Sequence, residues 1–395
     1  MSPSVQERLD VLMLLENNPY PHDIRVRREA EALVSAGHGV TVVAPRGDGQ
    51  PKRESVAGVS VRRFRLREGS GIRGLLAEYA VAHCALFLEA VRGLARGADV
   101  LHLHNPPDTL FPAGMLARAL GRKVVYDHHD LSPELFADKF GPSPVVRLLA
   151  HAQRASAVIA NATLVTNRSQ AAAVAEASPS ASRRTTIVRN GPPRDAVATF
   201  VSMRDGALDA PELVFVGTLE SQDGVFDLPE LLRAIDRELG SREARITVVG
   251  DGTARPELER RLARQPSLAG RVRLTGRVPH EEVAVLISEA DIAIDPAPGT
   301  PLNHQSTMIK IGEYLAAGRP TVAYRLDESV ATGGDAVRFA DCGDLEGFAG
   351  AVAELARDER LRREAAERAL RRAEDLVWER SAEELARVYE GFAAA

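Results

Sequence analysis

Residues 306–324 read STMIKIGEYLAAGRPTVAY, and this stretch predicts one helix followed by one buried strand. Ser306 is a suitable N-cap for the helix, and Gly318 with Pro320 marks its end. The apolar run Thr321–Ala323 follows at once. A helix that leads into a short β-branched run is the repeating unit of a parallel α/β sheet.

The same alternation extends along the chain in two series. Runs that we interpret as strands lie at Val11–Leu15, Val40–Ala44, Val100–His104, Arg122–Tyr126, Ala157–Ala160, Thr186–Val188, Leu213–Val216, Ile246–Val249, Val272–Leu274, Asp291–Ile294, Thr321–Ala323 and Ala336–Phe339. A polar, Pro-containing stretch at 192–211 separates the series. We therefore predict an α/β protein with two Rossmann-like, doubly wound domains at 1–195 and 205–375, and a helix at 376–395 that returns to the first domain.

Length and composition agree with this organisation. The 395 residues are about 2.6 times the roughly 150 residues of an average domain. The net charge of -5 argues against a general nucleic-acid binder. Two distant cysteines, Cys84 and Cys342, fit neither a disulfide framework nor a four-cysteine zinc site. With no evident signal sequence, and with residues 77–91 too short and polar to span a bilayer, we expect a cytoplasmic protein.

The first helix turn after Ser306 is the first candidate site. The amides of Thr307, Met308 and Ile309 would lack partners there, and with the helix dipole they would attract a phosphate. Lys310 adds a cation in the same turn, and Glu313 lies on the same face, where its carboxylate can accept hydroxyl hydrogen bonds. The alternative is a capped surface helix with a Lys–Glu pair.

Several motifs in register give this candidate site a family context. The chain resembles the retaining glycosyltransferases of family 4, and most closely a bacterial branch with the motif STM-x-K-x-x-EYMA-x-GKP. The matching segments include DIRVRREAEALVSAGHGVTVVAP, DVLHLHN, VVYDHHDLSPE, IVRNGPP, LVFVGTLESQDGV, ITVVGDG, VRLTGRVP and ADIAIDP. The resemblance implies the GT-B fold, in which two Rossmann-like domains face a central cleft.

The resemblance also implies roles for single residues. Lys310, Ser306 and the amides of Thr307 and Met308 would hold the donor diphosphate, and Glu313 the ribose. Gly217 and Thr218 would line the phosphate side, and Arg277 and Val278 the base. His129 would contact the donor sugar at the reaction centre. On the acceptor side we expect Asn17, Tyr20 and His128, with His128 and Asp130 in supporting positions.

Three positions depart from the family pattern. Gln305 stands where the first Glu of an EX7E pair is usual, and Thr218 and Asp223 stand where the family has Arg and Lys. We expect Lys310 to carry more of the charge neutralisation for this reason. The first strand is followed by NNPYPHD at 17–23 in place of a Gly-Gly loop, which changes the acceptor side.

A second constellation is rich in histidine. Alternation in Val100–His104 places His102 and His104 on one face of a strand, and DHHD at 127–130 follows another strand. Such a set can bind a metal, or its histidines can simply hydrogen-bond the backbone. The resemblance favours the second interpretation, because these enzymes generally work without a metal at the donor phosphates. We therefore predict neither a metal nor a cofactor.

A third constellation is basic, with Arg62, Arg63, Arg65, Arg67 and Arg73 ahead of the apolar helix. Such a patch can rest on an anionic membrane, here the inner face of the cell membrane. The alternative, which we favour from the sequence, is a solvated strand edge.

The reaction expected is transfer of a sugar from a nucleoside diphosphate sugar, with UDP-sugars favoured, to a hydroxyl acceptor. Polysaccharide, lipid-linked and natural-product acceptors stay open. A nucleotide-sugar epimerase, a metal-dependent hydrolase built on the histidines, and a scaffold subunit are the alternatives.

Overall fold

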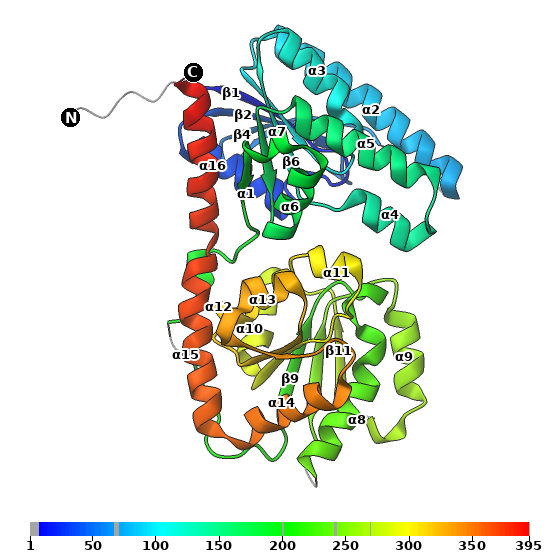
Figure 1. Ribbon diagram of the computed structural model, residues 1–395, viewed down its shortest axis with the longest axis vertical. Helices are drawn as coiled ribbons and strands as arrows, with labels where there is room; N and C mark the ends of the chain where they lie inside the picture. The colour runs from blue at the N-terminus through cyan, green and yellow to red at the C-terminus, as the bar shows by residue number, and fades with distance from the viewer. Residues whose placement is uncertain (1–7, 67–70, 200, 241–242, 269, 395) are drawn as a thin grey trace, which may run out of the picture. The chain divides into compact units, whose positions relative to one another are not determined.

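The computed structural model describes residues 8–66, 71–199, 201–240, 243–268 and 270–394. The chain divides into two compact units, one formed by Met1–Asn190 with Ser381–Ala395 and the other by Gly191–Arg380. Each unit contains one sheet covered by helices on both faces (Figure 1). In the part of the chain that the structure describes, no helix is both long and apolar enough to cross a membrane.

Unit 1 is built on an eight-stranded sheet in the order β3-β4-β2-β1-β5-β6-β7-β8. All neighbours pair in parallel except β3 and β4, which form an antiparallel hairpin. Its strands are β1 (Asp10–Leu14), β2 (Gly39–Pro45), β3 (Arg53–Val56), β4 (Val59–Phe64), β5 (Val100–His104), β6 (Lys123–His128), β7 (Ala162–Val165) and β8 (Thr185–Ile187). Its helices are α1 (Ile24–Ser35), α2 (Gly71–Ala95), α3 (Phe111–Ala119), α4 (Ser132–Phe140), α5 (Pro144–Ile159), α6 (Arg168–Ala177), α7 (Pro179–Ser182) and most of α16 (Trp378–Ala393).

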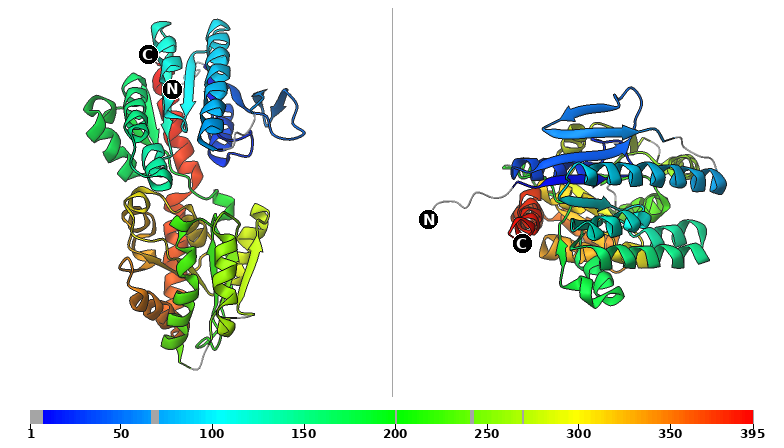
Figure 2. Two further views of the ribbon diagram at one scale, coloured as in Figure 1. Left: turned by 90° about the vertical axis from the view of Figure 1, so that its right-hand side faces the viewer. Right: turned by 90° about the horizontal axis from the view of Figure 1, so that it is seen from above.

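The alternation in β5 decides what each face of this sheet carries. Leu101 and Leu103 point into an apolar core shared with α2, α3 and α5, which form one layer (Figures 1 and 2). His102 and His104 point to the other face, where their imidazole rings stack with centroids 4.2 Å apart. Tyr389 of α16 reaches this face, and its hydroxyl lies 2.9 Å from His102 Nδ1. One strand thus serves a packed core on one side and a polar cluster on the other.

Unit 2 is built on a six-stranded parallel sheet in the order β11-β10-β9-β12-β13-β14. Its strands are β9 (Glu212–Val216), β10 (Arg245–Val249), β11 (Val272–Gly276), β12 (Ile292–Asp295), β13 (Thr321–Tyr324) and β14 (Val337–Ala340). Its helices are α8 (Leu228–Leu239), α9 (Arg255–Ala263), α10 (His280–Glu289), α11 (Pro301–Gln305), α12 (Ile309–Ala316), α13 (Asp327–Gly333), α14 (Leu345–Arg357) and α15 (Glu359–Leu376). Helices α8, α9 and α14 share one core, whereas α10 and α12 pack on the opposite face (Figure 1).

The predicted α/β architecture is confirmed, with two corrections to its elements. The run Ala157–Ala160 is not a strand: Ala157 lies in α5, where it is buried against the sheet, and the strand β7 follows at Ala162–Val165. Arg62 and Arg63 do not lie in an edge strand either, because β4 pairs with β2 on one side and β3 on the other, and Arg67 lies outside the described residues. Arg63 is accordingly buried, and it donates a hydrogen bond to the Tyr20 carbonyl oxygen at 2.8 Å.

Candidate active site

Strand order identifies where a ligand should bind in each unit. A parallel sheet opens a crevice where consecutive connections leave in opposite directions, beyond the carboxyl ends of the strands. In unit 1 this point lies between β1 and β5, and in unit 2 between β9 and β12. The two sites are described separately.

In unit 1, a series of buried ion pairs and hydrogen bonds runs from Arg25 through Asp127 to His129. The Arg25 guanidinium of α1 donates to both carboxylate oxygens of Asp127, at 2.9 and 2.6 Å. Asp127 Oδ2 lies 2.8 Å from His129 Nδ1. Arg25 also donates to the Val188 carbonyl oxygen at 2.8 Å and to Asn190 Oδ1 at 2.9 Å. These contacts fix the ring of His129 from one side, and 9% of the His129 side chain is exposed.

These contacts keep His129 protonated, and therefore cationic, at neutral pH. Burial alone would lower the pKa of the imidazole, but the Asp127 carboxylate outweighs it and raises the pKa to about 9. Burial opposes ionisation of Asp127 too, yet Arg25 and His129 hold its pKa well below the usual range. An imidazolium can stabilise negative charge and donate a hydrogen bond, but it has no free lone pair to accept a proton. The geometry therefore suits His129 to electrostatic stabilisation and not to general-base catalysis.

Backbone contacts hold His129 in place. Its amide donates to Asn105 Oδ1 at 2.8 Å, and its carbonyl oxygen accepts from Gln170 Nε2 at 3.2 Å. The Asn105 amide group also donates to the Asp130 carbonyl oxygen at 2.7 Å. His128 is fully buried, and its Nε2 lies 2.7 Å from Gln153 Nε2. The side chain of Tyr20 is buried as well, whereas Asn17 is exposed.

The predicted histidine cluster contains four possible metal ligands. Atoms of Glu29, His102, His104 and Asp127 lie within 4.8 Å of one another, whereas His128 and His129 are outside this group. Arg25 already supplies a cation to the cluster, because its Nη2 lies 3.1 Å from Glu29 Oε1 and 2.6 Å from Asp127 Oδ1. A divalent cation would have to displace or repel this buried guanidinium, so the contacts favour the metal-free interpretation.

Chelation tests this interpretation of the cluster. Transfer activity should survive prolonged dialysis against EDTA, with kcat/KM changed by less than about twofold, because the Arg25 guanidinium already neutralises the carboxylates of the cluster. The measurement is the initial rate before and after dialysis, with metal content determined on the same samples. Complete loss of activity that a divalent metal restores would contradict it.

The same buried groups predict that the protein is sensitive to alkaline pH. The pKa of Glu29 is raised from 4.5 to about 8, chiefly by burial, and that of His129 from 6.5 to about 9. The folded chain therefore holds protons that the unfolded chain releases, so the free energy of unfolding falls as pH rises from about 6.5 to 9. Urea melts across this range should show the fall, and Glu29→Gln should flatten part of it. A constant unfolding midpoint from pH 6.5 to 9 would contradict the prediction.

In unit 2, a buried ammonium lies between β9 and β12. Lys310 Nζ is 2.8 Å from Asp223 Oδ1 and 3.5 Å from Asp295 Oδ1. It also lies 4.5 Å from the centre of the Phe215 ring. Burial would lower the pKa of Lys310, but the two carboxylates raise it, so the side chain stays charged. Gly217 lies beside it, and a Cβ at that position would approach Nζ to 3.1 Å, so a larger residue would crowd the ammonium.

The loop that carries Asp223 is fixed by Asn303. Its side-chain amide donates to the carbonyl oxygens of Gln222 and Pro298, at 2.8 and 2.9 Å. Gly224 follows Asp223 with φ 74°, and a Cβ at that position would come within 2.1 Å of the Pro296 carbonyl oxygen. The loop after β9 and the loop after β12 are therefore held against each other around Lys310.

The predicted helix start at Ser306 is wrong. The helix α12 begins at Ile309 with Met308 as its N-cap, and Ser306 instead ends the short helix α11. Its hydroxyl donates to the Leu302 carbonyl oxygen at 2.8 Å and does not cap α12. The amides at the start of α12 are thus those of Ile309 and Lys310, two residues later than the amides of Thr307 and Met308.

The other predicted donor residues lie at the same edge of the unit 2 sheet. Gly217 and Thr218 follow β9, and Arg277 and Val278 follow β11. Glu313 lies in α12, one turn after Lys310, and is half-buried. The structure therefore brings the four loop residues to the carboxyl ends of the strands, where an α/β sheet binds ligands, and Glu313 lies in the helix that follows Lys310.

Sequence reasoning missed Arg25, Glu29, Asp295 and Asn303 as parts of these sites. Arg25 and Glu29 are four residues apart, a spacing that puts them on one helix face, and this signal was available. Asp295 ends an apolar run, where a lone carboxylate is unusual, and both its oxygens lack hydrogen-bond partners among the described residues.

Comparison with known proteins agrees with this arrangement. Residues 23–191 match the family described as Glycosyl transferase 4-like domain, and residues 210–358 match Glycosyl transferases group 1. An alpha-D-kanosaminyltransferase from Streptomyces kanamyceticus is 30% identical over 121 residues, which are 31% of this chain and 29% of that protein. The chain thus aligns with less than a third of that relative's length.

Solved structures match over nearly the whole chain. A sucrose-phosphate synthase from Thermosynechococcus elongatus aligns with 98% of this chain and 100% of its own, at TM-score 0.73 and 18% identity. The Anabaena protein Alr3699/HepE, solved with UDP and glucose, aligns with 97% and 99%, at TM-score 0.69 and 15% identity. By its two domain families and its fold, the chain belongs to the GT-B glycosyltransferases.

Proposed function

We propose that this chain is a retaining glycosyltransferase that moves a sugar from a nucleoside diphosphate sugar to a hydroxyl acceptor. The observation that carries the proposal is the Lys310 ammonium, buried between β9 and β12 with the start of α12 beside it. A diphosphate suits a site that combines a fixed cation with the backbone amides of a first helix turn, which have no partner within the helix. This site lies between β9 and β12, where an α/β sheet binds its ligands. HepE, which shares the fold, was solved with UDP and glucose, and this supports a UDP-sugar as the donor.

The reaction breaks the bond between the anomeric carbon and the diphosphate oxygen and forms a bond to the acceptor oxygen. Negative charge grows on the departing diphosphate, and Lys310 and the α12 amides stabilise it. The acceptor proton passes to the diphosphate, because His129 is already protonated at neutral pH. We assign His129 the electrostatic role in unit 1, and Glu313 the ribose hydroxyls in unit 2.

The acceptor is assigned to unit 1, on the side of Asn17, Tyr20 and His128. Tyr20 and His128 are buried, so we expect their contribution to be the shape of the acceptor site, with exposed Asn17 in direct contact. Both cysteines, Cys84 and Cys342, are free thiols, which supports a reducing compartment such as the cytoplasm.

An activity screen tests the proposed function. The full chain is incubated with UDP-, ADP-, GDP- and dTDP-sugars and a panel of hydroxyl acceptors, and nucleoside diphosphate release is measured. We expect acceptor-dependent release with one donor and a product whose anomeric configuration, read by NMR, is that of the donor. An epimer formed without acceptor would favour the epimerase, and an inverted product would contradict retention.

Glu313→Ala should raise the KM for the donor at least tenfold. We assign two ribose hydroxyl hydrogen bonds to the Glu313 carboxylate of α12, and charged hydrogen bonds of this kind are worth about 1.5–3 kcal/mol each. Donor titrations at saturating acceptor measure the effect. Glu282→Ala on α10, an exposed carboxylate of the same unit, is the matched control. An unchanged KM for the Glu313 variant would remove that residue from the donor site.

A further inference from the structure

Between residues 81 and 91, about three turns of helix α2, all exposed side chains are uncharged. Val81 and Leu88 are 55% and 52% exposed, and Phe87 and Val91 are each 39% exposed. The opposite face of the same helix, with Leu86 and others, fills the sheet core. A helix that is apolar on its outer face as well can bury that face against a second partner besides its own sheet.

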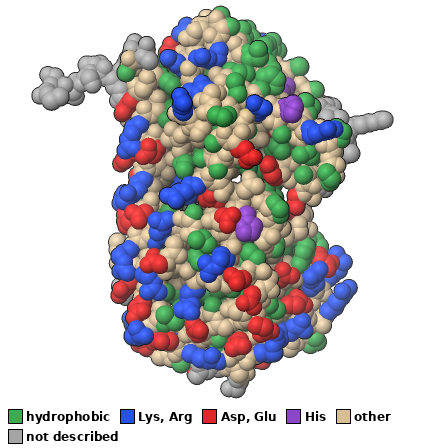
Figure 3. Space-filling view, viewed as in Figure 1, with side chains coloured by type: hydrophobic (Ala, Val, Ile, Leu, Met, Phe, Trp, Pro, Cys, Tyr) green, Lys and Arg blue, Asp and Glu red, His purple; other side chains and the backbone are tan. Residues whose placement is uncertain are grey.

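Exposed apolar side chains are concentrated around this helix. Of the thirteen large hydrophobic side chains that are exposed in the described ranges, ten lie between residues 81 and 158, on α2, α3, α4 and α5 or at their ends. Unit 2 has only Val285 and Ile309 among those described. Figure 3 shows hydrophobic side chains gathered where Figure 1 labels α2 and α3. The apolar surface is therefore a local feature of one helical layer.

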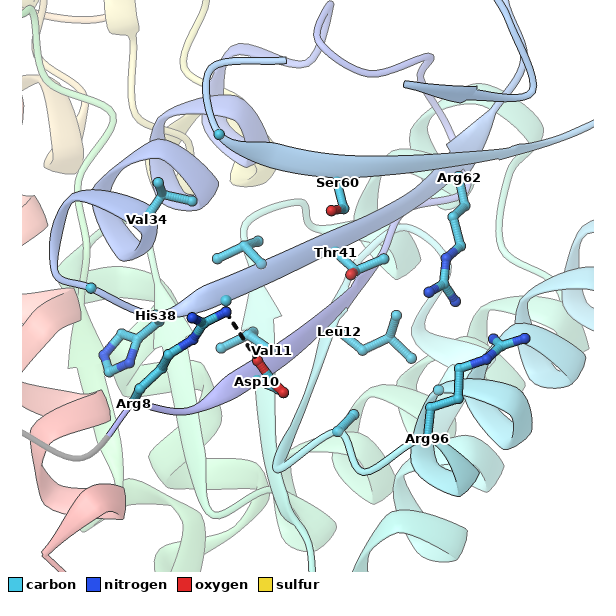
Figure 4. A pocket seen from close by; sticks show the side chains of 16 residues that line it. Arg8, Asp10, Val11, Leu12, Val34, His38, Thr41, Ser60, Arg62 and Arg96 are labelled. Carbon is cyan, nitrogen blue, oxygen red and sulfur yellow. Dashed lines mark ion pairs between the residues drawn. The ribbon is translucent and has the colours of Figure 1, made fainter. Parts of the chain in front are cut away.

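Arginine side chains border the apolar face of α2. A groove of about 630 Å³ runs between β4 and α2, and Leu88 lines it. A second groove of about 410 Å³ lies at the amino ends of β1, β2 and β4 and shares Arg62 and Arg96 with the first (Figure 4). The cations that line the first groove at the surface include Arg46, Lys52, Arg53, Arg62, Arg65 and Arg92.

Few acids balance these cations. Among the residues that the structure describes, Glu89 is the only carboxylate that lines the first groove, and it pairs with Arg62 at 3.7 Å and Arg92 at 2.7 Å. Within the described residues, Arg53, Arg65 and Arg96 have no acidic partner. The whole chain has a net charge of -5, so the positive charge of this surface is local and does not follow from the overall composition.

We propose that the α2 face and its arginine border form a docking surface for an anionic lipid bilayer. Apolar side chains of a helix insert at the boundary of the acyl chains, while flanking arginines contact lipid phosphates. A soluble polyanion would use the arginines and leave Val81 and Leu88 unexplained. A symmetric second copy would bring identical arginine borders together, and like charges would oppose that contact. An anionic bilayer would bind both the apolar side chains of α2 and the arginines that border them.

Vesicle flotation tests the proposal and needs neither donor nor activity, so its outcome is independent of the proposed function. The full chain is mixed with phosphatidylcholine vesicles with or without phosphatidylglycerol. We expect binding only to the anionic vesicles, weakened by high salt. The triple variant Arg53→Ser, Arg65→Ser, Arg96→Ser should bind about a hundredfold more weakly, since three surface cations are lost.

Two further variants make the result specific. Val81→Ser with Leu88→Ser should lower binding at least tenfold without changing net charge. The control Arg264→Ser, Arg273→Ser, Arg360→Ser removes three exposed cations from unit 2 and should bind like the wild type. All these side chains are exposed, and thermal melts verify that each variant is folded.

Three outcomes would overturn the proposal. Equal binding by the α2 variants and the control would show a nonspecific charge effect. Binding to heparin but not to anionic vesicles would make the surface a polyanion groove. A dimer in light scattering that Val81→Ser with Leu88→Ser dissociates, with no vesicle binding, would make it an interface between copies of this chain.

Discussion

His129→Ala should lower kcat by about 10²–10³-fold while leaving donor binding within a few-fold of the wild type. The size follows from the cost of removing one charged donor that stabilises developing negative charge. His129 is suited to this role because Asp127 holds it protonated, with a pKa of about 9. The measurements are kcat from steady-state transfer and donor Kd from calorimetry. His151→Ala, which removes an exposed imidazole from α5, is the matched control and should leave both kcat and the donor Kd unchanged.

The pH profile separates a charged His129 from a merely structural one. Wild-type kcat should fall as pH rises through about 9, because the imidazolium then loses its proton. Asp127→Asn removes the carboxylate that raises this pKa, so the alkaline limb should move toward lower pH. A kcat that keeps the same alkaline limb in the Asp127 variant, or a fully active His129→Ala enzyme, would contradict the assignment.

Lys310→Met should lower kcat/KM by about 10²–10³-fold, the second large effect. The methionine keeps the length of the side chain but removes the ammonium that contacts both Asp223 and Asp295. It also leaves the buried Asp295 and the half-buried Asp223 without this cation, and breaking a buried pair in this way costs about 3–5 kcal/mol of stability. Transfer kinetics should therefore show a lower kcat/KM, and a urea melt should show a lower unfolding midpoint.

The double variant Lys310→Met, Asp223→Asn distinguishes catalysis from stability. Neutralising Asp223 removes one unpaired carboxylate, so the unfolding midpoint should recover much of its loss. Activity should stay low, because the cation for the diphosphate is still absent. If activity returned together with stability, Lys310 would be a structural residue and its place at the donor phosphates would be wrong.

The alternation of helices and strands could be read from the sequence because each buried strand is a short β-branched run. The same signal failed at Ala157–Ala160, where four apolar residues belong to the last turn of α5 and its exit. A run of that length does not distinguish a strand from a buried helix end. The β3–β4 hairpin was missed because its arginines mask the alternation, although Val59 and Val61 are both buried.

The site was predictable where its residues follow strands and less so elsewhere. His129 and Lys310 stand near strand ends or in a motif, but Arg25 acts from α1, some hundred residues from Asp127, and only the fold brings the two together. The error at Ser306 has a local cause. Thr300 caps α11 by accepting a hydrogen bond from the Asn303 amide at 3.1 Å, and this short helix uses Ser306 as its end.

The departures from the family pattern also have a structural meaning. Asp223, where the resemblance leads us to expect a lysine, has its Oδ1 2.8 Å from Lys310 Nζ. The aspartate thus binds the cation that we assign to the diphosphate, and the usual second cation is absent at this position. Thr218, at the other altered position, is exposed beside the same loop. We therefore expect the proposed donor site to depend on Lys310 more than the family pattern implies.

A crystal structure of the full chain with its nucleoside diphosphate tests the central claim most directly. The claim predicts density for the diphosphate in unit 2, within hydrogen-bond distance of Lys310 Nζ and the first amides of α12, with the ribose at Glu313. A nucleotide bound elsewhere in the chain, with Lys310 still enclosed by Asp223 and Asp295 and no phosphate beside it, would contradict the claim.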